Sequence, residues 1–254
     1  MNPTWPAYVV IGAAGGIGSA LSRLLAAKGA RLFLVGQTAG KLEALSAELR
    51  EAYPKGEYVA HAADATESAS IDAAFTEATA KFGTLTGAAN LVGSLLLKPA
   101  HLTTDAEFEQ TLRLNAHTAF YTVRAAAKAM MDTGGSIVLA STVATRIGLA
   151  SHEAVAAAKS AVNGLVLSAA ATYASKNIRV NADAPGLEQT PLTAKITTSE
   201  LALKASIAMH PLGRIGAPED VAAAIAWLLD PATTWVTGQI IGIDGGLSTV
   251  KAKG

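Results

Sequence analysis

The sequence predicts an α/β protein in which seven parallel strands form a doubly wound sheet with helices on both faces. Short apolar runs alternate with longer helical patterns along the chain, which is typical of repeated strand–helix–strand units. A glycine-rich loop follows the first apolar run directly and opens a helical pattern. Of the 254 residues, 50% are hydrophobic and 16% are charged, which is enough apolar material for a substantial core. Because no linker, repeat or low-complexity segment interrupts the pattern, we expect residues 1–254 to form a single domain.

The strands are expected at short apolar runs bounded by turn-forming residues. These runs are residues 8–11, 31–35, 58–62, 87–91, 136–140, 179–182 and 239–243. The stretches between them have helical spacing. In residues 41–52, for example, Leu42, Leu45 and Leu49 recur every three or four positions.

Two helix starts, one long helix and one lid are also predicted. Thr104 with Glu107, and Thr197 with Glu200, have the spacing of a capping box. Residues 154–174 are rich in alanine, which favours a long helix packed closely against a neighbour. Residues 187–203 have mixed composition between a strand and a helix, so we expect them to form a lid over a site.

Composition restricts the class of protein. Twenty Lys and Arg residues balance twenty Asp and Glu, which argues against a nucleic acid as the main partner. The absence of cysteine excludes disulfides and thiolate metal sites, and no His, Asp and Glu cluster has metal-ligand spacing, so no metal is expected. No basic segment precedes Val9 and no apolar run reaches about 18 residues, so we expect a soluble cytoplasmic protein without a membrane partner.

The glycine-rich loop predicts a dinucleotide site. It reads Gly12-Ala13-Ala14-Gly15-Gly16-Ile17-Gly18 and lies between the first expected strand and a helix. Gly12 permits a tight turn, Gly16 lets the backbone approach a pyrophosphate, and Gly18 allows close packing of helix on strand. The helix N-terminus supplies N–H groups and a partial positive charge for the phosphates, with Ile17 in its first turn.

A second motif resembles the active-site signature of short-chain dehydrogenases/reductases. In that family a serine is followed thirteen residues later by a tyrosine and, four residues further on, by a lysine. Thr142, Val155 and Lys159 stand at these three places, with Ser141 as a fallback for the serine. The resemblance implies a Rossmann-type fold, a substrate hydroxyl or carbonyl oriented by Thr142, and a cofactor ribose bound by Lys159. It also implies that the family's proton donor is missing, because an isopropyl group can neither give nor take a proton.

Further stretches extend the resemblance from Tyr8 to Gly246. Asn90 and Gly93 match residues that shape the nucleotide pocket, and Asn115 matches an asparagine that kinks a long helix and holds a relay water. The alternative for Asn115 is a solvated or backbone-bonded side chain. The cofactor contacts implied for the C-terminal half are Pro185, Gly186 and Thr190.

Asp64 and Gln37 stand where the resemblance places the adenosine half of the cofactor. Asp64 matches an aspartate that reads the adenine amino group, although a helix N-cap explains its position equally well. Gln37 follows the second strand, where no carboxylate is present to bind a ribose 2′-hydroxyl or repel a 2′-phosphate. The missing acid slightly favours NADP(H) over NAD(H).

His152 is the first candidate to replace the tyrosine, because it lies three residues before Val155 and because imidazole groups in general suit acid–base work near neutral pH. The alternative is a polar helix start. His117 is a second candidate, whereas His101 and His210 are expected in loops or on the surface. Tyr173 lies about five helical turns beyond Val155, too far to substitute.

We therefore expect an NAD(P)(H)-dependent oxidoreductase acting on a carbonyl, hydroxyl or quinone-like small molecule, with His152 or water supplying the proton. Alternatives on the same fold are non-redox or oxygenase chemistry, or a non-catalytic NADP(H)-binding protein. Leucines that could form an apolar substrate pocket are more simply explained by ordinary packing; they are Leu95, Leu96, Leu97, Leu187 and Leu192. The resemblance also implies a homotetramer or dimer formed through two long helices.

Overall fold

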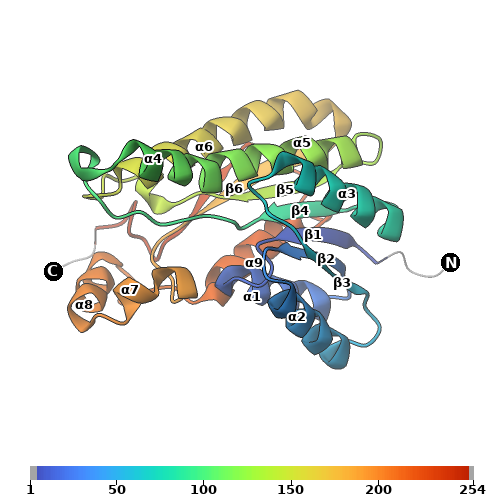
Figure 1. Ribbon diagram of the computed structural model, residues 1–254, viewed down its shortest axis with the longest axis horizontal. Helices are drawn as coiled ribbons and strands as arrows, with labels where there is room; N and C mark the ends of the chain where they lie inside the picture. Colours follow the sequence, from blue (N-terminus) through green and yellow to red (C-terminus); the bar gives the residue numbers. More distant parts are fainter. Residues whose placement is uncertain (1–4, 252–254) are drawn as a thin grey trace.

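The computed structural model, which describes residues 5–251, is built on a seven-stranded parallel sheet (Figure 1). The strand order is β3-β2-β1-β4-β5-β6-β7, and every neighbouring pair runs parallel. The predicted fold class is therefore confirmed. The strands are β1 (Ala7–Ile11), β2 (Arg31–Gly36), β3 (Tyr58–Ala62), β4 (Gly87–Asn90), β5 (Gly135–Ala140), β6 (Ile178–Pro185) and β7 (Ile240–Ile243).

The largest difference from the predicted strands is in β6. This strand has eight residues and ends at Pro185, whereas its apolar pattern predicts only residues 179–182. Asp183 interrupts the pattern, yet it pairs with Ala140 of β5 and Ile241 of β7. A carboxylate therefore lies inside a strand that is buried along nearly its whole length.

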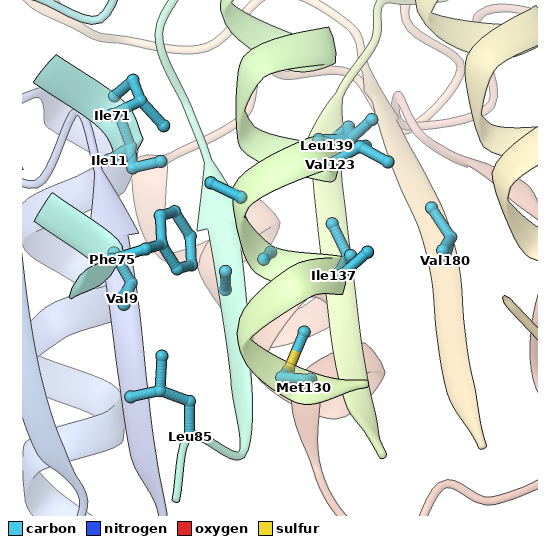
Figure 2. Close-up of a cluster of buried hydrophobic side chains, with 14 of the residues drawn as sticks. Val9, Ile11, Ile71, Phe75, Leu85, Val123, Met130, Ile137, Leu139 and Val180 are labelled. Carbon is cyan, nitrogen blue, oxygen red and sulfur yellow. The ribbon is translucent and has the colours of Figure 1, made fainter. Parts of the chain in front are cut away.

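Helices cover both faces of the sheet (Figure 1). On one face, leucines and alanines of α1, α2 and α9 form a core with Tyr8 and Val10 of β1. On the other face, α3, α5 and α6 pack on alternate strand residues, and Phe75 of α3 meets Val9 of β1 (Figure 2). The helices are α1 (Gly16–Ala27), α2 (Ala39–Ala52), α3 (Ser68–Phe82), α4 (Asp105–Leu112), α5 (Thr118–Met130), α6 (Glu153–Tyr173), α7 (Ala194–Thr197), α8 (Glu200–Met209) and α9 (Pro218–Leu229).

One of the two predicted capping boxes is correct. At the start of α4, Thr104 Oγ1 accepts from Glu107 N at 3.3 Å, and Thr104 N donates to Glu107 Oε2 at 2.8 Å. The box at Thr197 is wrong, because Thr197 ends the short helix α7. Ser199 caps α8 instead, where its hydroxyl accepts from Ala202 N at 3.4 Å.

The long alanine-rich helix is confirmed as α6. By length and composition, residues Glu153–Lys176 could cross a membrane, with a mean hydropathy of 1.4. Its buried side chains, Val162 and Val166 among them, join the core on the α3/α5 face of the sheet. In this fold α6 is therefore a core helix.

The strand order predicts where a ligand binds. β1 pairs with β2 on one side and with β4 on the other. Strands β2 and β3 are therefore added on one side of β1, and β4 to β7 on the other. In doubly wound sheets, ligands bind beyond the carboxyl ends of the strands at such a point. The glycine-rich loop leaves β1 there, and Leu91 to Gly93 leave β4 beside it.

Candidate active site

A cavity of about 670 Å³ lies at the carboxyl ends of the central strands. Its wall brings together residues from loops and helices far apart in the sequence. The sequence-predicted residues on this wall are Ile17, Gly93, Asn115, Thr142, His152, Lys159, Pro185, Gly186 and Thr190. A cavity of this size is typical of small-molecule sites.

The glycine-rich loop has the shape that its sequence predicts. Gly12 has a φ of +82°, a backbone conformation that favours glycine. A Cβ at Gly18 would overlap the carbonyl oxygen of Gly12, and one at Gly16 would lie 2.9 Å from Thr190 Cγ2. α1 begins at Gly16, so its first-turn N–H groups face the space beyond β1. This narrow cradle at a helix N-terminus fits the pyrophosphate of a dinucleotide.

Gln37 and Asp64 lie beside each other at the ends of β2 and β3. Asp64 Oδ1 accepts from both the backbone N and the hydroxyl of Thr66, each at 2.8 Å. These bonds, together with the Gln37 amide, lower the pKa of the Asp64 carboxyl. The alternative of a helix cap is wrong, because α3 begins at Ser68 with Glu67 before it. An ionised carboxylate can accept a hydrogen bond from an amino group such as that of adenine.

Asn115 lies in a π-helical turn, Arg113–His117, between α4 and α5. The regular helix is therefore interrupted where the kink is expected. Asn115 is only 1% exposed, so the solvated alternative is wrong, whereas the backbone-bonded alternative is confirmed. Its amide Nδ2 donates to Thr111 O at 2.8 Å, while its Oδ1 accepts from Ser94 N at 3.2 Å. π-Helical turns inside helices are frequent at functional sites.

The loop after β4 is fixed at both ends. The buried Asn90 accepts from Val92 N at 3.0 Å through its Oδ1. A Cβ at Gly93 would lie 2.9 Å from Asn115 Oδ1 and 3.2 Å from Lys159 Nζ. Only glycine leaves these two polar groups free to approach the backbone here.

Lys159, Thr142 and Val155 meet at the floor of the cavity. Lys159 Nζ donates to Ala140 O at 2.7 Å, and burial lowers the pKa of its ammonium group to about 8. Ser141 Oγ is bonded to Asn163 Oδ1 at 2.6 Å, so Thr142 is the freer of the two hydroxyls toward a ligand. Val155 is 3% exposed and offers no polar atom to the cavity.

Two histidines lie where the sequence predicts, His152 and His101, and two do not, His117 and His210. His152 lines the cavity at the N-cap of α6, with Nδ1 2.8 Å from Ala150 O. His117 does not join it; its ring packs beside Tyr121, with centroids 6.2 Å apart. His101 is exposed, as expected. His210 is not a surface residue but is only 4% exposed and lines the cavity.

Comparison with known proteins agrees with this geometry. A family model described as enoyl-(acyl carrier protein) reductase matches residues 12–248. A cis-4-hydroxycyclohexanecarboxylate dehydrogenase from Sinomonas cyclohexanicum is 36% identical over 95% of this chain and 96% of its own. A short-chain type dehydrogenase/reductase from Mycobacterium ulcerans superposes with a TM-score of 0.92 at 32% identity, over 97% of this chain and 91% of that one. The chain belongs to the short-chain dehydrogenase/reductase family.

A further solved structure is of a similar protein together with NADPH. A variant of actinorhodin polyketide ketoreductase, described as holding NADPH, matches with a TM-score of 0.91 at 25% identity. The match covers 98% of this chain and 100% of that one. Members of the family bind NAD(P)(H).

Three buried titratable residues of this short-chain dehydrogenase/reductase were missed by sequence reasoning. They are Asp183, Glu188 and His210. Burial raises the pKa of the Asp183 carboxyl to about 7 and that of Glu188 to about 9. His210 has Nδ1 2.6 Å from Ser206 O, and its Nε2 accepts from Leu187 N at 3.2 Å. For Asp183, the sequence did carry one signal of an unusual position, which is an acidic residue inside the apolar pattern of a strand.

Glu188 makes stability depend on pH. Its pKa is raised from an ordinary 4.5 to about 9, so the folded protein holds a proton that the unfolded chain releases between these values. The free energy of unfolding should therefore fall as pH rises from about 5 to about 9. We expect Glu188→Gln to flatten this fall and to raise the melting temperature at about pH 8, measured by thermal unfolding across this range. The exposed Glu43→Gln is the control, and equal slopes for Glu188→Gln and wild type would contradict the assignment.

The segment predicted to form a lid borders the cavity with apolar side chains. Residues 187–203 include a 3-10 turn, α7 and the start of α8. Leu187, Leu192 and Ile196 from this segment line the same cavity as Leu95 and Leu97. The preferred explanation of the leucines as ordinary packing is therefore wrong for four of the five, and Leu96 is the exception because it does not line the wall.

Proposed function

We propose that this chain is an NAD(P)(H)-dependent oxidoreductase that interconverts a hydroxyl and a carbonyl on a small, largely apolar cyclic molecule. The observation that carries the proposal is a single cavity lined by Lys159, Thr142 and Ile17 of the glycine-rich loop on one part and by apolar residues of segment 187–203 on another. A relative that is 36% identical over nearly the whole chain is a dehydrogenase of a hydroxycyclohexanecarboxylate. An activated, quinone-like ring carbonyl belongs to the same substrate class. Residues 187–203 would act as the lid over this substrate.

The cofactor site is assigned from the contacts described above. The cradle of Gly12, Gly16 and Gly18 would hold the pyrophosphate, and Gln37 with Asp64 would contact the adenosine. Lys159 would bind the nicotinamide ribose, while Pro185-Gly186 and Thr190 would position the nicotinamide ring. When bound, the nicotinamide gives or takes the hydride. We favour NADP(H) slightly over NAD(H), because Gln37 carries no charge to repel a 2′-phosphate.

Thr142 and Val155 define what this chain contributes to the chemistry. The Thr142 hydroxyl lines the cavity and can hold the substrate oxygen by a hydrogen bond. Val155 occupies the family's tyrosine position, so the proton on that oxygen must come from His152 or from water. An acceptor whose developing negative charge is delocalised, such as a quinone, makes the smallest demand on that proton donor.

Turnover of a substrate panel tests the proposed function. Purified protein with NADPH or NADH would be assayed against cyclic ketones and quinones, and with the oxidised cofactors against cyclic alcohols. We expect cofactor-dependent turnover of at least one cyclic substrate. Cofactor binding without turnover of any of them would favour a non-catalytic NADP(H)-binding protein instead.

His152→Ala distinguishes the two proton sources. If the imidazole is the acid, the variant should lose at least about tenfold in turnover, on the order of 1.4 kcal/mol. If water is the acid, turnover should stay within about threefold of wild type, because His152 is bonded to Ala150 O at the cavity mouth. His101→Ala, in an exposed turn, is the control.

We further propose a homo-oligomer of two or four cytoplasmic subunits, packed through α5 and α6. Phe120 on α5 is 53% exposed and Leu167 on α6 is 57% exposed, which suits contact with the same helices of another copy. Light scattering of the intact chain would measure the number of subunits.

A further inference from the structure

Lys159 is a buried cation with a carboxylate close behind it. Its Nζ donates to the carbonyl oxygen of Ala140, and Ala140 pairs in the sheet with Asp183. The charge of Asp183 acts on Lys159 and favours its protonated form, against the effect of burial. Both carboxylate oxygens of Asp183 are buried and have no hydrogen-bond partner in the described part of the chain. A buried carboxylate without hydrogen bonds is costly unless a positive charge offsets it, and Lys159 supplies that charge.

Val155 and several polar groups line the same cavity as Lys159. Val155 lies four residues before Lys159 in α6, so the two side chains share one helix face. Lys159 Nζ and Asn115 Oδ1 both approach Gly93, and the Thr142 hydroxyl faces the same cavity. A bound water needs two to four polar partners, and these groups provide them.

The other titratable groups of the cavity are less suited to give a proton at its floor. His210 has both ring nitrogens in hydrogen bonds, to Ser206 O and from Leu187 N. Glu188 also holds a proton at neutral pH, because burial raises its pKa to about 9. Its carboxyl lies beside Gly216, however, and not beside Gly93, where Lys159 Nζ and Asn115 Oδ1 approach. His152 precedes α6 at the mouth of the cavity, with Nδ1 engaged by Ala150 O. Lys159 is buried, and Asp183 favours its charged form.

We propose that Lys159 is the proton donor in this enzyme, acting through a water molecule held beside Val155, and that Asp183 is a positioning residue that keeps Lys159 charged. The proposal rests on the proposed oxidoreductase function and deepens it. As the carbonyl carbon is reduced, the C=O electron pair moves to the oxygen, which takes a proton from the water. The water takes a proton from the Lys159 ammonium group, which becomes a neutral amine and recovers a proton from solvent. Oxidation of the alcohol runs through the same steps in reverse.

Asp183→Asn tests the pair without cofactor. In cofactor-free protein labelled with ¹³C-lysine, NMR follows the titration of the Lys159 Cε signal. Removing the negative charge should lower the pKa of Lys159 by at least about half a unit. In the enzyme assay, carbonyl reduction needs the ammonium form, so its rate should fall as pH rises through that pKa. In the Asp183→Asn variant, the pH at which the rate falls should be lower than in wild type by as much as the pKa of Lys159 is lowered. A merely structural role for Asp183 would not produce this shift of the pH–rate profile.

Lys159→Arg tests the donor itself. Arginine keeps the positive charge and donates hydrogen bonds to a ribose, but with a pKa above about 12 it does not release a proton. We expect the NADPH dissociation constant to stay within about fivefold of wild type, while turnover falls at least about 100-fold. Adding Val155→Tyr to this variant should restore turnover, because a phenol no longer depends on the lysine for the proton itself. Circular dichroism and thermal unfolding confirm that each variant is folded.

Three outcomes would overturn the proposal. The first is a Lys159→Arg variant that keeps more than about a tenth of wild-type turnover. The second is a pKa of Lys159 that does not change in Asp183→Asn, and the third is a His152→Ala variant whose rate no longer falls as pH rises. Each of these leaves cofactor binding and turnover by the wild type intact, so it contradicts the proton donor alone. A wild type that binds neither NADPH nor NADH would contradict the proposed function and this proposal together.

Discussion

Val155→Tyr is expected to raise the rate of cyclic ketone reduction by at least about 100-fold, since a positioned general acid contributes about 10²- to 10⁴-fold. Val155 is buried, lines the cavity and lies one turn before Lys159. A phenol at this place would reach the same volume as the Thr142 hydroxyl, and the nearby ammonium group of Lys159 would lower its pKa. The measurement is kcat for a ketone that the wild type reduces slowly, at saturating cofactor.

Val155→Phe is the matched control for this gain. It adds the same ring without the hydroxyl, so it reproduces any effect of filling the cavity beside Lys159. We expect Phe to leave the rate at or below the wild-type level. Equal rates for the Tyr and Phe variants would show that the phenolic proton is not what the site lacks.

Gly18→Ala is expected to weaken cofactor binding strongly and to destabilise the fold. The added Cβ would overlap the carbonyl oxygen of Gly12 and come within 2.9 Å of Ala13 Cα, both backbone atoms that cannot rotate away. Overpacking of this kind costs about 1–3 kcal/mol. Because the clash lies inside the phosphate cradle, the NADPH dissociation constant should rise at least about tenfold and the melting temperature should fall. Fluorescence titration and thermal unfolding measure the two effects.

Gly40→Ala is the control for the glycine variant. Gly40 lies in the first turn of α2, and a Cβ added there meets nothing within 4 Å. The same chemical change should leave cofactor binding unchanged and stability unchanged or slightly higher, because alanine favours a helix over glycine. Loss of binding in both variants would mean that the Gly18 effect is not specific to the cradle.

The fold could be predicted from the sequence because each element carries a local pattern. The alternation of apolar runs and helical spacing identifies β1 to β5 to within about two residues, a precision normal for element ends. The glycine loop is local at two positions, since Gly12 needs its positive φ and Gly18 lies against the backbone of Gly12 and Ala13, whereas Gly16 is required by the distant side chain of Thr190. Thr104 with Glu107 is a local signal too, because both partners lie in one helical turn.

The parts that could not be predicted depend on contacts between distant segments. His210 becomes part of the site only because the end of α8 folds onto Leu187 and Gly245. Asp183 is buried because β7 and β5 pair on both sides of it, which its own sequence neighbours do not reveal. His117 was a second candidate on spacing alone, but it ends the π-helical turn Arg113–His117 and its ring packs beside Tyr121. Site residues of this kind need the tertiary fold.

The cavity also explains why the substrate was less predictable than the cofactor. The proposed cofactor contacts come from residues such as Gly12 and Lys159, whose roles follow from backbone geometry and charge. The proposed substrate half is formed by residues 187–203, where Leu192 and Ile196 line the same cavity as leucines from the loop after β4. Leucine spacing in a sequence does not distinguish a pocket wall from ordinary packing.

Titration of the wild-type chain with NADPH and with NADH, followed by fluorescence, tests the central claim most directly. We expect saturable binding of one cofactor per subunit with a dissociation constant in the micromolar range, on the order of −8 kcal/mol, and tighter binding of NADPH than of NADH. The Gly18→Ala variant should not saturate in the same range. Absence of binding by the wild type to either cofactor at about 1 mM would contradict the claim that this chain is a nicotinamide-dependent enzyme.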